Sequence, residues 1–325
     1  MIRRSEIGLT LFPMKATEIE ITEPLELTES QRGLVDMHSF LNMLNVLLGE
    51  MFLIAMTAKD AGTLGHSLAL AEELRRQLDA RRFDQSLADV MDGAQRIFQT
   101  EMAQLLQKQP DLRANAELQE SVANIQSVFK VLRVRTAEYV ARLSRPDAWV
   151  AFDIVKLTDD FLNFFAAVEK NSKGRYRIVF NIAAQEPADY LVNLRIESVA
   201  GDTITMPPVL QDVFRDLIAN ARKYTPAGGM IVAGLADTGA EIRMAVEDNG
   251  RGIPPGEIRR VVQFGYRASN AKDVRTKGGG FGLTKAYLAA KRHGGRMWIK
   301  SALGSGTRVT LCIPHPRAPL ATATP

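Results

Sequence analysis

The first part of the chain has the hydrophobic spacing of α-helices. Between residues 34 and 55, apolar side chains recur every three or four positions, which places them on one face of a helix. Thr28 and Gln31 have the spacing of a capping box, so we expect this helix to begin just after Thr28. The expected apolar face consists of Leu34, Met37, Leu41, Leu44, Leu48, Met51 and Ala55.

Two further helical patterns follow before residue 145. One runs from about Ser67 to Gln107 and is ended by Pro110, which has no amide hydrogen for a helix interior. The other ends near Ser144 and carries a heptad-like apolar stripe. Together these patterns predict a helical bundle over residues 28–145. The stripe consists of Leu118, Val122, Ile125, Phe129, Leu132, Tyr139 and Leu143.

Beyond residue 145 the pattern changes to short β-type runs that alternate with helical ones. This alternation predicts an α/β sandwich, and therefore an α+β chain in which a helical bundle comes first. Strands are expected at residues 176–181, 230–235, 242–247, 297–301 and 307–313, and helices at 157–169, 209–224 and 281–293. The expected organisation is an N-terminal segment (1–27), a helical region (28–145), an α/β domain (146–314) and a disordered Pro/Ala-rich tail (315–325).

The composition is that of a globular chain with about two domains. The chain has 325 residues, of which 46% are hydrophobic and 24% charged. Its one cysteine, Cys312, excludes a disulfide framework and a multi-cysteine metal site. Asn45 and Glu50 interrupt the most apolar stretch, which therefore falls short of the about 20 apolar residues of a membrane span. Residues 1–10 lack the apolar core of a secretory signal, so the sequence predicts a cytoplasmic protein.

Positive charge is concentrated in one segment. The whole chain carries a formal net charge of +4, which is too small to indicate a nucleic-acid partner. Residues 251–277 alone contain seven Lys and Arg against two acidic residues. A local excess of this kind suits either a solvated loop or a compact polyanion such as a triphosphate.

Polar residues share one face of the helix expected at 209–224. Asp216, Asn220 and Lys223 lie at positions i, i+4 and i+7, opposite an apolar face. An oxygen ligand beside a cation suits hydrated Mg2+ and a phosphate, although a solvated helix face has the same composition.

Three glycine-rich segments follow this helix. Asp248 ends an expected strand and precedes Gly250 and Gly252, where the backbone can approach a ligand while the carboxylate accepts a hydrogen bond. Residues 277–283 open a helix, whose free amide groups favour phosphate. Residues 304–307 lie between two strands. Each segment taken alone is also compatible with an ordinary turn.

In this order the segments resemble the ATP-binding domain of sensor histidine kinases, the Bergerat-type fold shared with gyrase-like and mismatch-repair ATPases. The resemblance covers about residues 150–314 and implies ATP binding. The matching segments are residues 216–225 (N box), 248–253 (G1 box), 264–267 (F box), 278–283 (G2 box) and 304–307 (the last glycine element).

The resemblance implies a role for each of these residues. Asp248 would accept a hydrogen bond from the adenine amino group, and Asn220 would coordinate Mg2+. Lys223 would approach the phosphates and Tyr224 would lie against the nucleotide, under a lid formed by residues 259–277. The implied ATP-binding residues are Asn220, Lys223, Tyr224, Asp248, Gly250, Gly252, Ile253, Arg267, Lys277, Gly278, Gly280, Phe281, Gly282, Leu283 and Thr307.

Asp216 departs from the family's pattern. The kinases commonly have Asn at this position, whereas related ATPases have Glu, which activates water. Two interpretations follow: Asp216 supports some ATP hydrolysis, or it only alters the surroundings of Mg2+.

His38 is the expected phosphoacceptor. A neutral imidazole nitrogen can attack phosphorus, and a histidine kinase needs such a group on a helical bundle. His38 follows the apolar residue Met37 and has Asn42 on its own side of the helix. This segment is similar to the family's H box, except that Ser39 replaces the usual acid. Of the other histidines, His66 has no obvious polar partner, His293 is expected to cap a helix and His315 lies in the tail.

The resemblance implies a soluble, dimeric two-component histidine kinase. It would use Mg-ATP to autophosphorylate His38 and pass the phosphoryl group to an aspartate of a response-regulator receiver domain, with Asn42 positioning water for the reverse reaction. An ATP-binding adaptor of the same fold, without histidine chemistry, is the alternative that Ser39 and the long helical region 63–145 favour. A gyrase-like ATPase is disfavoured because no transducer domain follows residue 314, and residues 1–27 are too short for a sensor domain.

Overall fold

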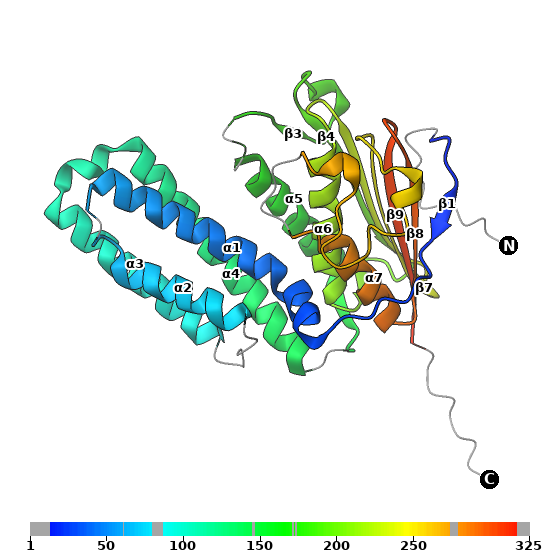
Figure 1. Ribbon diagram of the computed structural model, residues 1–325, viewed down its shortest axis with the longest axis horizontal. Helices are drawn as coiled ribbons and strands as arrows, with labels where there is room; N and C mark the ends of the chain where they lie inside the picture. Colours follow the sequence, from blue (N-terminus) through cyan, green and yellow to red (C-terminus); the bar gives the residue numbers. More distant parts are fainter. Residues whose placement is uncertain are drawn as a thin grey trace, which may run out of the picture. The chain divides into compact units, whose positions relative to one another are not determined.

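The computed structural model describes residues 14–60, 62–79, 87–144, 147–170, 172, 174–273 and 279–316. The chain separates into two compact units. One is entirely helical, and the other contains all of the described strands together with the remaining helices (Figure 1). The expected α+β class, with a helical bundle followed by an α/β sandwich, is confirmed.

The helical unit is a four-helix bundle formed within one chain (Figure 1). The first helix packs against the second and the fourth, and the third packs against the same two. Two helices, which lie alongside each other, occupy the helical stretch expected over residues 67–107, because helical periodicity alone does not distinguish a hairpin from one long helix. The helices are α1 (Glu29–Ala58), α2 (Gly65–Asp79), α3 (Leu87–Lys108) and α4 (Ala116–Ser144), with a 3-10 turn at Pro110–Ala114.

Helix α1 begins where the capping box predicts. The amide of Gln31 donates to the Thr28 hydroxyl over 3.2 Å, and the Gln31 side chain accepts from the Thr28 amide over 3.0 Å. The helix ends at Lys59, whose φ of 51° turns the chain out of the helix.

The core of the bundle runs along α1. Leu44, Leu47, Met51 and Ile54 are fully buried in it together with side chains of the other three helices. In the part of the chain that the structure describes, Phe40–Ala58 is also the one helical stretch long and apolar enough to cross a membrane, with a mean hydropathy of 1.6. The expectation that no segment has this property is therefore not confirmed.

A seven-stranded mixed sheet forms the second unit, with the strand order β1-β8-β9-β7-β6-β4-β3. Two further strands, β2 and β5, form a small antiparallel sheet. The strands are β1 (Glu18–Glu20), β2 (Val150–Asp153), β3 (Ile178–Val179), β4 (Tyr190–Ser198), β5 (Thr203–Met206), β6 (Met230–Asp237), β7 (Glu241–Asp248), β8 (Arg296–Ala302) and β9 (Gly306–Pro314).

Three helices cover one face of this sheet (Figure 1). They are α5 (Ile154–Lys170), α6 (Val209–Tyr224) and α7 (Gly282–Arg292). Burial alternates along β7 and β8 because successive side chains point to opposite faces of a strand and only one face meets the helices. The sheet and the helices share one hydrophobic core.

The structure differs from the expected strands in two ways. The strand expected at 176–181 is reduced to Ile178–Val179, because Asn181 begins a 3-10 turn and accepts the amide of Ala183 through its side chain. Strands β1, β2, β4 and β5 were not expected. β1 adds to the edge of the sheet by pairing antiparallel with β8, so residues 18–20 belong to the α/β unit.

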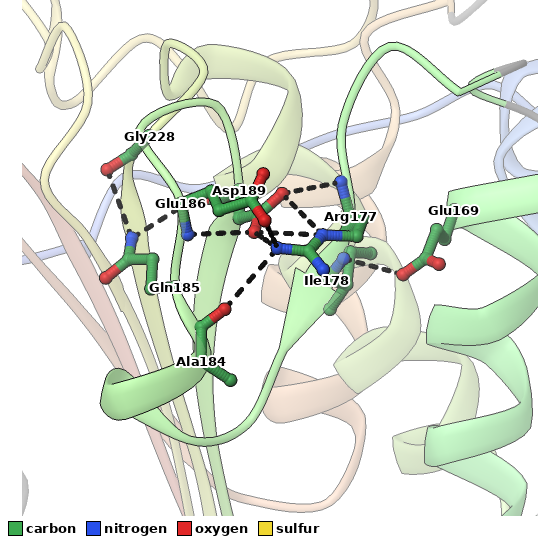
Figure 2. A network of polar contacts seen from close by, with 8 residues as sticks. All are labelled: Glu169, Arg177, Ile178, Ala184, Gln185, Glu186, Asp189 and Gly228. Carbon is green, nitrogen blue, oxygen red and sulfur yellow. Dashed lines mark hydrogen bonds and ion pairs between the residues drawn. The ribbon is translucent and has the colours of Figure 1, made fainter.

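A polar network holds the segment that leads into β4 (Figure 2). The Arg177 guanidinium donates to the Asp189 carboxylate, with Nη2 at 2.6 Å from Oδ2, and the amides of Arg177 and Glu186 donate to the same carboxylate. The hydrogen bonds from Arg177 lower the pKa of Asp189 to about 2. The Gln185 side chain reaches the carbonyl of Gly228, which lies just after α6. The network therefore ties this segment to the loop between α6 and β6.

Candidate nucleotide site

Helix α6 presents its polar face to the N-terminus of α7. Asp216 and Asn220 are half-buried on α6, opposite the fully packed face that faces the sheet. A Cβ atom added at Gly282 would lie 2.8 Å from the side-chain nitrogen of Asn220 and 3.6 Å from the Asp216 Cβ, so a side chain there would force Asn220 to shift. The structure thereby brings the N-box and G2-box residues together. The packed face consists of Leu210, Val213, Phe214, Leu217, Ile218 and Ala221.

Asp248 is a buried carboxylate at the end of β7. Its side chain is only 7% exposed, and its Oδ1 accepts the amide of Gly250 over 2.8 Å. Burial raises the pKa of Asp248 to about 7, although hydrogen bonds from the backbone of Gly250 and Thr307 act in the opposite direction. A buried acid of this kind is a specific acceptor for a ligand that donates a hydrogen bond.

The glycine element between β8 and β9 packs directly on Asp248. Gly306 has φ of +101°, and a Cβ atom there would lie 1.8 Å from the Asp248 carbonyl oxygen. The neighbouring Thr307 pairs with Asp248 across the β7–β9 ladder. The Ile253 amide donates to the Ser301 hydroxyl over 2.8 Å, which fixes the segment after the G1 glycines to β8. Residues 304–307 are thus part of the site as well as a strand connection.

The segment after β7 is held by its own polar contacts. The Glu257 carboxylate accepts from the Tyr266 hydroxyl over 2.9 Å and from the Ser269 amide over 2.7 Å. The Asn270 side chain donates to the carbonyl of Gly252 over 2.9 Å. Arg251 pairs with Asp273 over 2.8 Å. Part of the expected lid therefore has a defined conformation in the described residues.

The F box contacts both the G2 box and the N box. The rings of Phe264 and Phe281 lie 4.7 Å apart, and a Cβ atom at Gly280 would come within 3.1 Å of the Tyr266 carbonyl oxygen. Arg267 donates to the Ala271 carbonyl and also bonds the Tyr224 hydroxyl. Leu283, in the first turn of α7, packs against the shared core. The expected residues Lys277 and Gly278 lie outside the described residues.

Two cations converge at the end of α6. Lys223 is half-buried with its Nζ 5.0 Å from the centre of the Tyr224 ring. Burial, together with the charges of Arg267 and Arg222, lowers the pKa of Lys223 to about 8. Burial also raises the pKa of Tyr224. Positive groups that repel one another in a partly buried site form a binding position for a polyanion.

Lys285 is a site residue that the sequence analysis missed. Its Nζ lies 3.4 Å from Asp216 Oδ2 and 3.6 Å from Asp212 Oδ2, and the residue is 6% exposed. A signal was present in the sequence, because a cation in the first turn of a helix is disfavoured by the helix dipole and requires a compensating partner. The acids that compensate it lie on another helix, about 70 positions earlier in the chain.

The residues of this site fit an adenine nucleotide. Asp248 is a buried acceptor, Lys223 and Arg267 are cations, and α7 offers its N-terminal amides beside Gly282. The described residues contain no group of three or more His, Cys, Asp or Glu that could hold a metal by itself. A Mg2+ ion that binds through one side chain and phosphate oxygens needs no such group.

In the helical unit, His38 lies beside Asn42. The His38 Nε2 is 3.0 Å from the Asn42 Nδ2, as expected for residues four apart on a helix. His66, for which no polar partner was expected, lies beside Glu101 of α3, with its Nδ1 3.1 Å from Glu101 Oε1. The Glu101 carboxylate also accepts hydrogen bonds from the backbone amides at the start of α2. The pairing spans 35 positions and has no signature in the local sequence.

The other two histidines lie in the α/β unit. His293 caps the end of α7, as expected, with its amide directed at the last carbonyls of the helix. His315 does not belong to a free tail: its Nε2 lies 2.9 Å from Asp237 Oδ1, and its ring stacks on Trp149 at 4.6 Å. Residues 317–325, the rest of the expected tail, lie outside the described residues.

Part of the chain matches a known family model. Residues 205–317 match the family described as histidine kinase-, DNA gyrase B-, and HSP90-like ATPase. The match begins at the end of β5 and includes α6, β6, β7, α7, β8 and β9. It therefore contains the Asp216, Asp248 and Gly282 surroundings described above.

Curated relatives are kinases that the chain covers only in part. The histidine protein kinase DivJ of Caulobacter vibrioides is 34% identical over 116 residues, which are 36% of this chain and 19% of that protein. The adaptive-response sensory kinase SasA of Synechococcus elongatus is 34% identical over 37% of this chain and 31% of its own length. The sensor-like histidine kinase SenX3 of Mycobacterium tuberculosis is 26% identical over 77% of this chain and 61% of its own length.

Solved structures give weaker likenesses. The catalytic domain of the histidine kinase ThkA is 18% identical with a TM-score of 0.37, over 51% of this chain and 97% of that one. Full-length ShkA in complex with AMPPNP is 20% identical with a TM-score of 0.38, over 60% of this chain and 40% of that one. Residues 205–317 are therefore similar to the family described as histidine kinase-, DNA gyrase B-, and HSP90-like ATPase.

Proposed function

We propose that the chain is a cytoplasmic protein-histidine kinase of a two-component system. It binds Mg-ATP in the α/β unit, phosphorylates its own His38, and passes the phosphoryl group to an aspartate of a response-regulator receiver domain. The observation that carries the proposal is the buried Asp248 carboxylate, which Gly250 and Gly306 approach closely, together with the close approach of α6 to Gly282 at the N-terminus of α7. The kinase names of the relatives DivJ, SasA and SenX3 support it.

Nucleotide binding follows from the chemistry of the site residues. Asp248, once ionised, accepts a hydrogen bond from the adenine amino group, and the close backbone packing at Gly250 and Gly306 fixes the position of this carboxylate. Lys223 and Arg267 attract the phosphates, and the amides at the start of α7 donate to them. Asn220 supplies an oxygen for Mg2+, which offsets phosphate charge when it is bound.

His38 is prepared for phosphoryl transfer by its neighbour on α1. With the Asn42 amide nitrogen as donor, Nε2 of His38 is the unprotonated nitrogen and the ring is neutral. Asn42 has to release this nitrogen before it attacks the γ-phosphorus. The N–P bond then forms as the bond from phosphorus to the bridging oxygen breaks, and ADP leaves.

The helical unit also offers a surface for protein partners. On α1, Phe52, Leu53 and Met56 are 50%, 47% and 74% exposed although they are large and apolar. Exposed apolar groups close together on one helix favour association. We propose that they contribute to a homodimer through the helical unit, with the receiver domain binding nearer to His38. Light scattering should give twice the chain mass, and Met56→Glu should lower it to the mass of one chain.

An ATP-binding adaptor without histidine chemistry is the second candidate. Two observations favour it: Ser39 stands where the family's acid is expected, and the four helices close a complete core within one chain. Such a bundle could recognise a partner protein without being phosphorylated.

Incubation of the full chain with Mg-ATP, followed by mass spectrometry, separates the two candidates. We expect acid-labile, alkali-stable phosphate on His38, lost in His38→Gln and retained in the control His66→Gln. Phosphate that persists in His38→Gln would refute the assignment of His38, and its appearance on His66 would move the role to the His66–Glu101 pair. Nucleotide binding without any phosphohistidine would favour the adaptor.

A further inference from the structure

A buried lysine lies against the acid at the head of the N box. Lys285 is in the first turn of α7, and its ammonium group is 3.4 Å from Asp216 Oδ2 and 3.6 Å from Asp212 Oδ2. The Lys285 side chain is 7% exposed, so water does not screen these contacts effectively. One cation therefore bridges two carboxylates that lie one helical turn apart on α6.

The charges of this cluster balance within the protein. Asp212 also receives Arg215, whose Nη1 lies 3.3 Å from Asp212 Oδ1, while Arg215 itself lies over the Phe161 ring. Two acids, Asp212 and Asp216, are thus matched by two bases, Arg215 and Lys285. Buried charges are tolerated when they are paired in this way, whereas an unmatched one is strongly unfavourable.

Asp216 is the member of the cluster that reaches the nucleotide site. Its side chain is 23% exposed, against 5% for Asp212. Its Cβ lies next to the position of Gly282, on the same side as the Asn220 amide. The carboxylate that could meet Mg2+ or a water near the phosphates is therefore the one that Lys285 holds.

We propose that Lys285 is a positioning residue that keeps Asp216 as an ion-paired carboxylate, so that the site favours phosphoryl transfer to histidine over hydrolysis. The inference depends on the proposed nucleotide function. In hydrolysis a water oxygen would bond to the γ-phosphorus, the bond to the bridging oxygen would break to release ADP, and Asp216 would accept the water proton. An ammonium group beside that carboxylate opposes the proton transfer, because the positive charge lowers the affinity of the carboxylate for a proton.

The test uses the full chain and ADP, which cannot be hydrolysed to release its terminal phosphate by this route. Calorimetric ADP affinities are measured with and without Mg2+ for wild type, Lys285→Met, Lys285→Arg, Asp216→Asn, Asp216→Asn/Lys285→Met and the control Lys291→Met. Lys291 is an exposed lysine of the same helix that lies over the Tyr287 ring. Phosphate release from Mg-ATP is measured in parallel.

We expect Lys285→Met to weaken ADP binding in the absence of Mg2+ about fivefold. The factor by which Mg2+ increases ADP affinity should rise about tenfold, because Asp216 then carries an unmatched charge beside the phosphates. Phosphate release should rise about tenfold. Adding Asp216→Asn should remove all of these changes, Lys285→Arg should resemble wild type, and Lys291→Met should change nothing. A merely structural Lys285 would give effects that Asp216→Asn does not suppress.

Changes in Lys285→Met that persist in the double variant, or no change at all, would overturn the inference. If Lys285→Met does not fold, the variant Asp216→Asn decides. This variant leaves the positive charge of Lys285 unmatched, so ADP binding without Mg2+ should tighten about fivefold. An unchanged ADP affinity would overturn the inference. Failure of the proposed function looks different, because the wild-type chain would then not bind ADP in any condition.

Discussion

Replacing Asp248 with Asn should separate nucleotide binding from fold stability. Asn has nearly the same shape and keeps one carbonyl oxygen for the Gly250 amide, which is 2.8 Å away in the structure. Its amide group, however, presents a donor where the adenine amino group also donates. Losing one charge-assisted hydrogen bond in a buried site costs about 2–4 kcal/mol, so ATP affinity should fall by roughly 30- to 1000-fold.

The same substitution should stabilise the fold at high pH. Burial raises the pKa of Asp248 from 3.8 to about 7, so the folded chain holds a proton that the unfolded chain has already released between these values. The free energy of unfolding therefore falls as pH rises from about 4 to 7. A shift of about three units corresponds to at most about 4 kcal/mol. Asp248→Asn removes this penalty, so its advantage over wild type should be absent near pH 4 and greatest above pH 7.

Urea unfolding at pH 4.5 and pH 8, with calorimetric titration of ATP at pH 8, measures both effects. Glu247→Gln is the matched control, because Glu247 is the adjacent buried acid and pairs with Arg308. It should lose stability and leave ATP affinity within about threefold. An Asp248→Asn chain that binds ATP like wild type, or that is less stable than wild type at pH 8, would refute the reasoning.

Three further predictions concern other parts of the α/β unit. Gly306→Ala should lower the free energy of unfolding by more than about 2 kcal/mol, because the new Cβ would lie 1.8 Å from the Asp248 carbonyl oxygen. Gly304 has φ of +67° and open space around it, so the control Gly304→Ala should cost about 1 kcal/mol. Equal losses in urea unfolding would contradict this prediction. The pKa of Lys223 is lowered to about 8, so about half of these side chains are uncharged at pH 8 and phosphate binding should take up roughly half a proton. Calorimetry in two buffers measures this uptake, which should be absent in Lys223→Met. The pKa of Asp189 is lowered to about 2, so its contribution to stability is complete above about pH 4 and is lost as pH falls toward 2. In Asp189→Asn the free energy of unfolding should depend less steeply on pH between about 4 and 2. An unchanged pH dependence would argue against the pairing with Arg177.

The parts of the fold that depend on local chemistry could be predicted from the sequence. The Thr28 capping box begins α1. Glycine also marks two close approaches: Gly282 of the G2 box meets the N box, and Gly306 meets the backbone of Asp248 in the G1 box. These requirements leave a signature within a few residues. The expected α+β class followed from the change in hydrophobic period near residue 145.

The parts that depend on distant partners could not be predicted. Lys285 and His66 meet their acids on other helices, and such pairs leave no spacing to read in one sequence. Strand β1 is only three residues long and contains two glutamates, so neither its length nor its composition resembles a strand; it exists because β8 offers an open edge. The division of the expected helical stretch into α2 and α3 likewise depends on packing within the bundle.

The position of β1 makes the helical unit an insertion within the α/β unit. The chain leaves the sheet at Glu20, passes through all four helices, and returns to the α/β unit at β2. Two covalent connections therefore join the units. Any rearrangement that brings a histidine to the nucleotide must be compatible with both connections at once. A fragment cut to begin after the helices would also lose β1 and leave the backbone of β8 open to a foreign strand.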